Sequence, residues 1–193
     1  MKYKLQKFPI PILPSKSFYN HLILVSITLG MVFIIKYWYI SSTEKDLFFI
    51  LYPVTGLIEL YSGQLSVYLP DSGFYFSSLN ILINKSCSGV NFWVIALCVS
   101  AWNVANHIHD LKKKLLGLAL SLLCAYVLTL FTNSLRILTA IWLTDLKEIV
   151  PWIASSWFHQ AQGAFTYLSV LVAYHLGIQT IISHKKTFDY PTV

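Results

Sequence analysis

Four long apolar runs dominate the sequence, each about the length that a helix needs to cross a hydrocarbon core. They cover residues 21–40, 90–108, 115–131 and 157–182. Hydrophobic residues make up 56% of the 193-residue chain and charged residues only 11%, whereas a soluble domain is typically about 25% charged. The chain lacks the charge to cover a soluble globule. We therefore expect an integral membrane protein.

Two shorter apolar stretches interrupt this pattern. Residues 47–61 contain Pro53 and Glu59, and residues 134–143 contain Arg136. Stretches of this length are more typical of interfacial or re-entrant helices than of full spans. We therefore predict two short helices of that kind.

Residues 64–86 lie between these helices and read as a surface hairpin or irregular loop, because the turn residues 70–73 separate two short aromatic and aliphatic runs. The predicted fold class is thus an all-α polytopic membrane protein with about four full transmembrane helices, two short helices and one hairpin-like loop. We expect one membrane-embedded domain over 1–193, with a cytoplasmic arm at 1–19 and a core at 47–178.

The distribution of charge favours four spans with both termini in the cytoplasm. That arrangement puts nine basic residues inside: Lys2, Lys4, Lys7, Lys16, Lys112, Lys113, Lys114, Lys185 and Lys186. It leaves five outside: Lys36, Lys45, Lys85, Arg136 and Lys147. This is the bias of the positive-inside rule. Because the lysines form short clusters between apolar runs rather than one basic stripe, we expect no nucleic-acid partner.

Three cysteines are present, without a CxxC pair or a zinc-ligand spacing. Cys98 and Cys124 lie inside apolar runs, which is typical of small core residues. Cys87 stands instead in a polar segment, Lys85-Ser86-Cys87-Ser88-Gly89, just before an apolar helix. The positive end of a helix dipole favours a thiolate, which indicates a reactive thiol. The alternative is a half-buried structural cysteine.

Arg136 and His159 are the other candidate site residues. Arg136 is the only arginine among fourteen basic residues, which indicates a need for its planar set of donors, although an arginine bound to lipid phosphate would look the same. His159 begins the last apolar run, where an imidazole is suited to proton transfer, or else lies in the aromatic belt of the interface. His21 and His175 read as interfacial or helix-packing residues, and no histidine pair has a carboxylate at ligand spacing. We expect neither a metal nor a cofactor.

The predicted topology brings Cys87, Arg136 and His159 to one outer interface, each at the end of an element. A nucleophilic thiol, a guanidinium that stabilises an oxyanion and an imidazole that transfers protons suit thiol acyl transfer.

In these segments the chain resembles the exosortase/archaeosortase family of polytopic membrane cysteine transpeptidases. The matching pieces, in the same order, are Cys87-Ser88-Gly89 before a span, the 133–137 segment Asn-Ser-Leu-Arg-Ile after a span, and His159 with Gly163 four residues later. The resemblance covers about residues 47–177, and the short chain is similar to the compact exosortase K type. The family often carries Glu-Ala before Cys-Ser-Gly, where this chain has Lys85-Ser86.

The resemblance implies an enzyme that cleaves a C-terminal sorting signal of secreted proteins and transfers them to an acceptor through a thioester. Cys87 would be the nucleophile, Arg136 would stabilise the oxyanion and His159 would transfer protons. Ser88 and Asn133 would be supporting groups. It also implies a bacterial inner membrane, an extracytoplasmic site, and sorting-signal proteins and membrane lipids as partners.

Three other readings stay open. A non-catalytic transporter or assembly subunit would use Arg136 and His159 to line a polar cavity. A thiol–disulfide oxidoreductase is disfavoured, because no second outward cysteine could resolve a mixed disulfide with Cys87. A lipid-handling enzyme would more naturally use several arginines or carboxylates.

Overall fold

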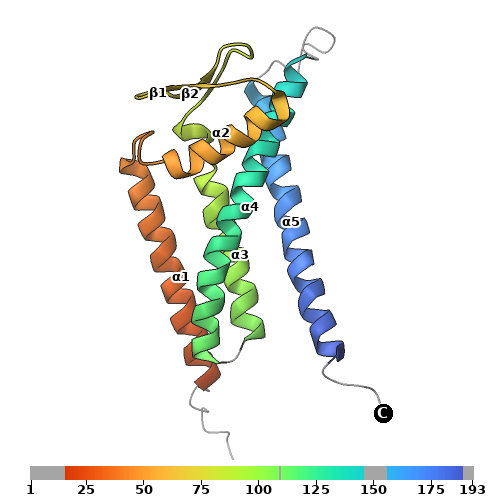
Figure 1. Cartoon of the computed structure of the whole chain (residues 1–193). Helices are drawn as coiled ribbons and strands as arrows, with labels where there is room; N and C mark the ends of the chain where they lie inside the picture. The colour runs from red at the N-terminus through yellow and green to blue at the C-terminus, as the bar shows by residue number, and fades with distance from the viewer. Residues whose placement is uncertain (1–15, 109, 146–155, 189–193) are drawn as a thin grey trace, which may run out of the picture.

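The computed structural model describes residues 16–108, 110–145 and 156–188. The described chain is mostly helical and carries one small sheet (Figure 1). In order, its elements are α1 (Lys16–Ser41), α2 (Phe48–Ser62), β1 (Val67–Leu69), β2 (Gly73–Phe76), β3 (Ile81–Ile83), the 3-10 turn η1 (Lys85–Cys87), α3 (Val90–His107), α4 (Leu111–Asp145) and α5 (Ser156–Phe188).

Four of the helices, α1, α3, α4 and α5, are long and apolar enough to cross a membrane, which confirms the predicted fold class. Large apolar side chains cover their outer faces, for example Phe33 on α1, Leu123 on α4 and Phe165 on α5, and all three are exposed. In lipid such side chains need no protein cover, because hydrocarbon tails solvate them as well as a core would. The chain is therefore an integral membrane protein.

The short helix α2 confirms the prediction for residues 47–61 and lies across one end of the bundle (Figure 1). It buries Ile50, Val54 and Ile58 at helical spacing and contacts α4. Pro53 has no N–H for the carbonyl of Phe49, one turn earlier. The hydroxyl of Tyr126 on α4 donates to that carbonyl at 2.6 Å. A proline is thus tolerated inside α2 because a neighbouring helix supplies the missing donor.

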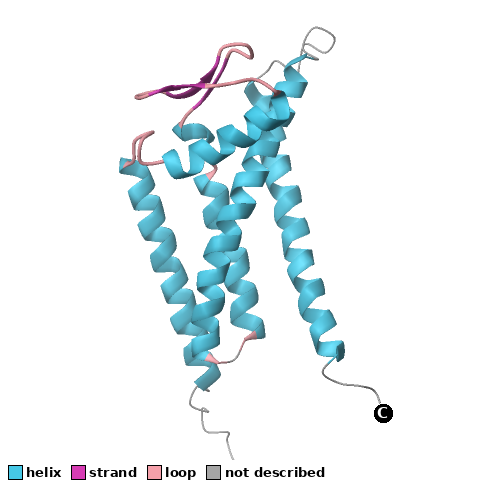
Figure 2. Cartoon of the chain, viewed as in Figure 1, coloured by secondary structure: helices cyan, strands magenta, loops and turns pink. Residues whose placement is uncertain are grey.

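The hairpin prediction for residues 64–86 is confirmed and extended by a third strand (Figure 2). Strand β1 pairs antiparallel with β2, with Leu69 opposite Gly73, and β2 pairs antiparallel with β3. A Cβ on Gly73 would stand 2.2 Å from the carbonyl oxygen of Ile83, so only glycine lets the strands come so close. Phe74, Phe76 and Ile83 are buried in a cluster with the apolar face of α2.

The prediction of a second short helix at 134–143 is wrong, because these residues continue α4 without a break. The polar residues at this point of the chain are accommodated inside the helix. The hydroxyls of Thr129, Thr132 and Ser134 each donate to the carbonyl four residues earlier, at 2.6, 2.7 and 2.8 Å. Arg136 consequently lies within a helix, and the prediction that it stands at an element end is also wrong.

Polar contacts join α3 to α5. Ser100 Oγ lies 2.8 Å from the hydroxyl of Tyr174, and the Asn103 side chain contacts both His175 and Gln179, at 3.3 and 2.9 Å. The prediction that His175 packs between helices is confirmed. Interhelical hydrogen bonds of this kind hold membrane helices together where burial of apolar surface gives no net gain.

The prediction that Cys98 and Cys124 are core residues is wrong, because both are exposed. Each lies on the outer surface of its helix, Cys98 on α3 and Cys124 on α4. The apolar runs that contain them are membrane spans, so an apolar context there indicates contact with lipid as readily as burial in protein.

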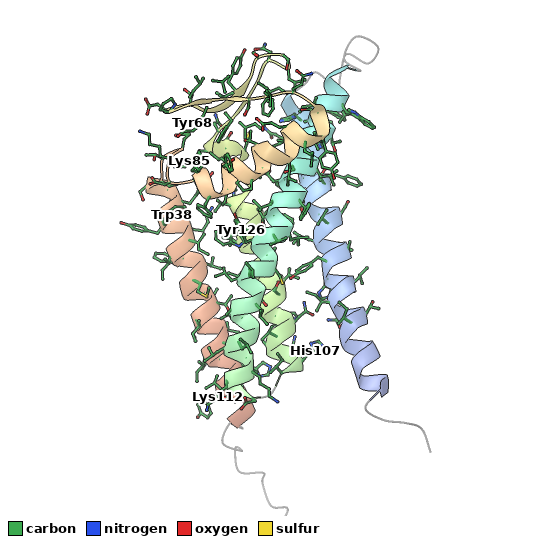
Figure 3. All side chains as sticks on the ribbon, in the orientation of Figure 1. Trp38, Tyr68, Lys85, His107, Lys112 and Tyr126 are labelled. Carbon is green, nitrogen blue, oxygen red and sulfur yellow. The ribbon has the colours of Figure 1, made fainter. Side chains whose placement is uncertain are left out.

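The bundle has two chemically different ends. One, which we call the sheet end, holds the end of α1, α2, the sheet and the starts of α3 and α5 (Figure 1). The other, the lysine end, holds the start of α1, the end of α3 at His107 and the start of α4 with Lys112 (Figure 3). The end of α5 lies there too. Because the chain has an even number of candidate spans, the start of α1 and the end of α5 lie at the same end of the bundle.

We expect the lysine end to face the cytoplasm. In a variant whose three native cysteines are replaced by alanine, Ser72→Cys in the β1–β2 turn should react with a membrane-impermeant maleimide in intact cells. Lys112→Cys should react only after permeabilisation, because positive loops stay inside. Labelling of Lys112→Cys and protection of Ser72→Cys in intact cells would contradict this orientation.

Candidate functional site

Cys87 ends a tight turn that its neighbours hold in place. The Asn84 side chain accepts from the backbone N–H and the hydroxyl of Ser86, at 3.1 and 2.7 Å. The backbone of Asn84 accepts from the N–H of Cys87 at 2.8 Å, and that of Lys85 accepts from the N–H of Ser88 at 3.1 Å. These bonds define the Cys87 turn, residues 84–88. Its cysteine is half-buried, with Sγ 3.8 Å from the Ser86 hydroxyl.

Gly89 lets the Cys87 turn lie directly against α4. Its φ of 73° is in the left-handed region that glycine adopts readily. A Cβ there would lie 3.1 Å from Cγ of Asn133 and 3.2 Å from Cγ2 of Thr129, tighter than most such contacts. Across this gap the Asn133 amide donates to the backbone carbonyl of Cys87. The Cys-Ser-Gly order thus has a structural reason: the glycine brings the cysteine to Asn133.

Tyr167 of α5 links this contact to Arg136. The Tyr167 hydroxyl donates to Oδ1 of Asn133 at 2.8 Å. Its ring lies under the guanidinium of Arg136, with Cζ 5.6 Å from the ring centroid, which is a cation–π contact. Cys87, Asn133, Arg136 and Tyr167 therefore form one connected group, which we call the Cys–Arg cluster.

Gly163 and Gln162 of α5 contact Arg136 of α4. A Cβ on Gly163 would lie 3.3 Å from both Cδ and Nη1 of Arg136, so glycine makes room for the guanidinium. Gln162 donates to the backbone carbonyl of Arg136 at 3.3 Å. Within residues 16–108, 110–145 and 156–188, four buried side-chain atoms have no hydrogen-bond partner: Nε of Arg136, Oε1 of Gln162, Oγ of Ser88 and Oγ1 of Thr55 on α2. Buried polar atoms normally have partners, so each of these atoms has the capacity to pair with a polar ligand or water.

His159 lies in the first turn of α5, as predicted, and its side chain is exposed. It precedes Gly163 and Tyr167 by four and eight residues, so the three share the helix face that meets α4. No hydrogen bond joins His159 to Cys87 or Arg136 in the described part of the chain. The structure thus brings Cys87 and Arg136 together through Tyr167 and Asn133. It leaves the imidazole at the same end of the bundle, one turn above Gly163.

The predicted supporting residues differ in what they do. Asn133 is fully buried and bridges two helices, whereas Ser88 is buried with its hydroxyl unpaired. Sequence reasoning missed Tyr167 and Gln162. The signal for Tyr167 was its spacing of eight residues from His159 and four from Gly163, which puts all three on one helix face.

Among the residues described, no group of three or more His, Cys, Asp or Glu side chains could hold a metal ion.

No family model matches the chain, and no curated protein or solved structure matches it significantly.

Asn133 should contribute strongly to stability. Replacing it by leucine, which has a similar size, leaves the Cys87 carbonyl and the Tyr167 hydroxyl without this partner inside the membrane. We expect Asn133→Leu to lower the free energy of unfolding by about 2 kcal/mol, measured by SDS titration in mixed micelles. The control is Thr139→Val, on the same helix, whose hydroxyl bonds only its own helix backbone. Equal effects of the two variants would contradict the bridging role.

Proposed function

We propose that this protein is a membrane-embedded cysteine peptidase and transpeptidase of the exosortase/archaeosortase type. It would cleave a C-terminal sorting signal of secreted proteins and pass them to an acceptor through a thioester. The observation that carries this proposal is the Cys–Arg cluster: Tyr167 and Asn133 link the only arginine of the chain to the backbone carbonyl of Cys87. A thiol and a guanidinium that belong to one connected group suit acyl transfer.

The first half of the reaction uses Cys87 and Arg136. The thiolate Sγ attacks the carbonyl carbon of the scissile peptide bond, forming a C–S bond while the carbonyl electrons move to oxygen. Arg136 stabilises that oxyanion, and in a poorly hydrated site its positive charge acts more strongly than in water. The oxyanion then collapses and the C–N bond breaks.

The second half uses His159 as the proton carrier. The imidazolium gives its proton to the departing amine, which leaves with the sorting signal, and the acyl group stays on Cys87 as a thioester. The neutral imidazole then takes a proton from the acceptor nucleophile, which attacks the thioester and releases the thiolate. Its exposed position at the start of α5 supports this role, because both the leaving amine and the acceptor need access to it.

The unpaired atoms beside Arg136 support a peptide as the substrate. Nε of Arg136 is a donor and Oε1 of Gln162 is an acceptor, and both are buried without a partner in the described chain. A peptide group offers one carbonyl acceptor and one N–H donor, so a single extended residue could pair with both. Because binding that satisfies buried polar atoms recovers their desolvation cost, this complementarity favours a peptide backbone over an apolar ligand.

The membrane setting suits a substrate that has its own spanning segment. A sorting signal held by an apolar helix diffuses in two dimensions and presents its cleavage motif at a fixed depth, which raises its effective concentration. The cluster lies at the sheet end of the bundle, opposite the lysine end, so the positive-inside rule supports a site on the extracytoplasmic side. Secreted proteins and membrane lipids are therefore the proposed partners.

A second candidate is a non-catalytic transporter or assembly subunit. The polar contacts between α3 and α5, made by Ser100, Asn103, Tyr174, His175 and Gln179, favour it, because polar groups inside spans often line a pathway. On this reading Cys87 has no chemical role. Substitution of Cys87 would then leave transport or assembly unchanged, whereas substitution of His175 would impair it.

Replacing the nucleophile separates the two functions. We expect Cys87→Ala to abolish cleavage of a co-expressed protein that ends in an apolar segment and a basic tail, because the other two cysteines, Cys98 and Cys124, lie on the outer surfaces of their helices. Immunoblotting for the cleaved product gives the readout, with the amount of enzyme in the membrane measured in parallel. Cys98→Ala, at an exposed cysteine on α3, should process normally. Normal processing by Cys87→Ala would refute the proposal.

The planar set of hydrogen-bond donors of Arg136, and not only its positive charge, should contribute to kcat. We expect Arg136→Lys to lower kcat by about 10²-fold or more, since an oxyanion donor is typically worth that factor and lysine lacks the planar set of donors. Cleavage rates of a purified substrate in liposomes would measure this loss. An Arg136→Lys enzyme with a kcat like the wild type would show that Arg136 takes no part in stabilising the oxyanion.

A further inference from the structure

The Cys87 turn is fastened to the far end of α1 by the lysine two residues before the cysteine. Nζ of Lys85 donates to the backbone carbonyls of Ile40 and Ser42, at 3.1 and 2.7 Å. In the opposite direction, the hydroxyl of Tyr39 donates to the backbone carbonyl of Lys85 at 3.1 Å. The contacts span more than forty residues of sequence, and Figure 3 shows Lys85 beside the end of α1 that carries Trp38.

These bonds are strong for a physical reason. Helix α1 ends at Ser41, and the last carbonyls of a helix have no partner within it. They also form the negative end of the helix dipole, which attracts a cation. The ammonium of Lys85 therefore caps the end of α1 with two charge-assisted hydrogen bonds. It also lies 5.0 Å from the centroid of the Tyr39 ring, which adds a cation–π contact.

The surroundings of Lys85 are ordered by further bonds. Oδ2 of Asp46 accepts from the backbone N–H and the hydroxyl of Thr43, at 2.7 and 2.9 Å. These two bonds, and to a lesser degree the positive charge of Lys85, hold the pKa of Asp46 below its ordinary value. On the other side of the cysteine, Nζ of Lys36 donates to Oδ1 of Asn91 at 2.6 Å. Helix α1 thus holds the chain both before and after Cys87.

We infer that Lys85 is a positioning residue, which clamps the Cys87 turn to the end of α1 and so fixes Cys87 opposite Asn133. The link is short. The Lys85 carbonyl that receives the Tyr39 hydroxyl also accepts from the N–H of Ser88, and that bond closes the turn. Movement at the end of α1 is therefore transmitted to the cysteine through one shared carbonyl. Helix α1 acts as part of the site as well as a membrane anchor.

The clamp itself can be tested without any substrate. Hydrogen–deuterium exchange of the whole 193-residue chain in nanodiscs would follow the amides of Cys87 and Ser88 in Lys85→Met, which keeps an unbranched side chain one atom shorter and removes its donors. We expect exchange there to become about tenfold faster, because the turn loses its external support. Lys85→Arg, which can still donate to both carbonyls, should exchange within about twofold of the wild type. Unchanged exchange in Lys85→Met would overturn the inference.

A matched control tests whether loss of a positive charge alone would loosen the Cys87 turn. Lys45 is an exposed lysine in the connection between α1 and α2, so Lys45→Met makes the same chemical change at the same end of the bundle. It should leave exchange of the Cys87 turn at the wild-type rate. Faster exchange throughout α3, α4 and α5 in Lys85→Met, rather than in the turn alone, would mean that Lys85 supports the whole bundle. That result would also overturn the inference.

The effect on catalysis rests on the proposed function and is measured separately. We expect Lys85→Met to lower kcat for sorting-signal cleavage about tenfold or more with little change in KM, since a misplaced nucleophile impairs the chemical step more than binding. Lys85→Arg should restore kcat. If Cys87→Ala still cleaves while Lys85→Met still loosens the turn, the proposed function fails and the clamp stands. If Cys87→Ala is inactive and Lys85→Met is unchanged in both exchange and kcat, the clamp fails alone.

Discussion

The site depends on the two hydrogen bonds of Asn133. Its amide donates to the carbonyl of Cys87, and its carbonyl oxygen accepts from the hydroxyl of Tyr167. One buried side chain thus joins the Cys87 turn, α4 and α5, and the tyrosine in turn supports Arg136. An amide can do this because it offers a donor and an acceptor at once, so neither neighbour is left unpaired in a medium without water.

The same constraint explains the rest of the architecture. In a bilayer, apolar contact between helices gives little net gain, so polar bonds decide which helices meet. Tyr126 supplies the donor that Pro53 removes from α2, and Asn103 connects α3 to α5. Most buried polar atoms of the described chain have a partner, so the unpaired atoms of Arg136, Gln162 and Ser88 stand out, together with Oγ1 of Thr55 on α2. Arg136 and Ser88 are residues that the sequence also singles out.

The sequence predicts the spans and the chemically reactive residues, but not the contacts that depend on how the helices pack. Apolar length located the spans and α2, because that signal depends only on the thickness of the bilayer. It failed at 134–143, because α4 continues through the polar residues that interrupt the apolar run, and their hydroxyls bond to their own helix backbone. Cys87, Arg136 and His159 were found by chemistry, but their connection through Tyr167 depends on how α4 and α5 pack, which composition does not encode. Lys85 was noticed only as a departure from a family pattern, and its role became visible with the end of α1 beside it.

We propose that Cys87 is an acylated nucleophile, linked to Arg136 through Asn133 and Tyr167. Intact-protein mass spectrometry of the purified enzyme, incubated in liposomes with a sorting-signal substrate and quenched in acid, tests this claim most directly. We expect an added mass equal to the substrate's acyl portion, located on Cys87 and released by hydroxylamine as a thioester would be. A substrate that is cleaved without any adduct on Cys87, or with the adduct on another residue, would contradict it.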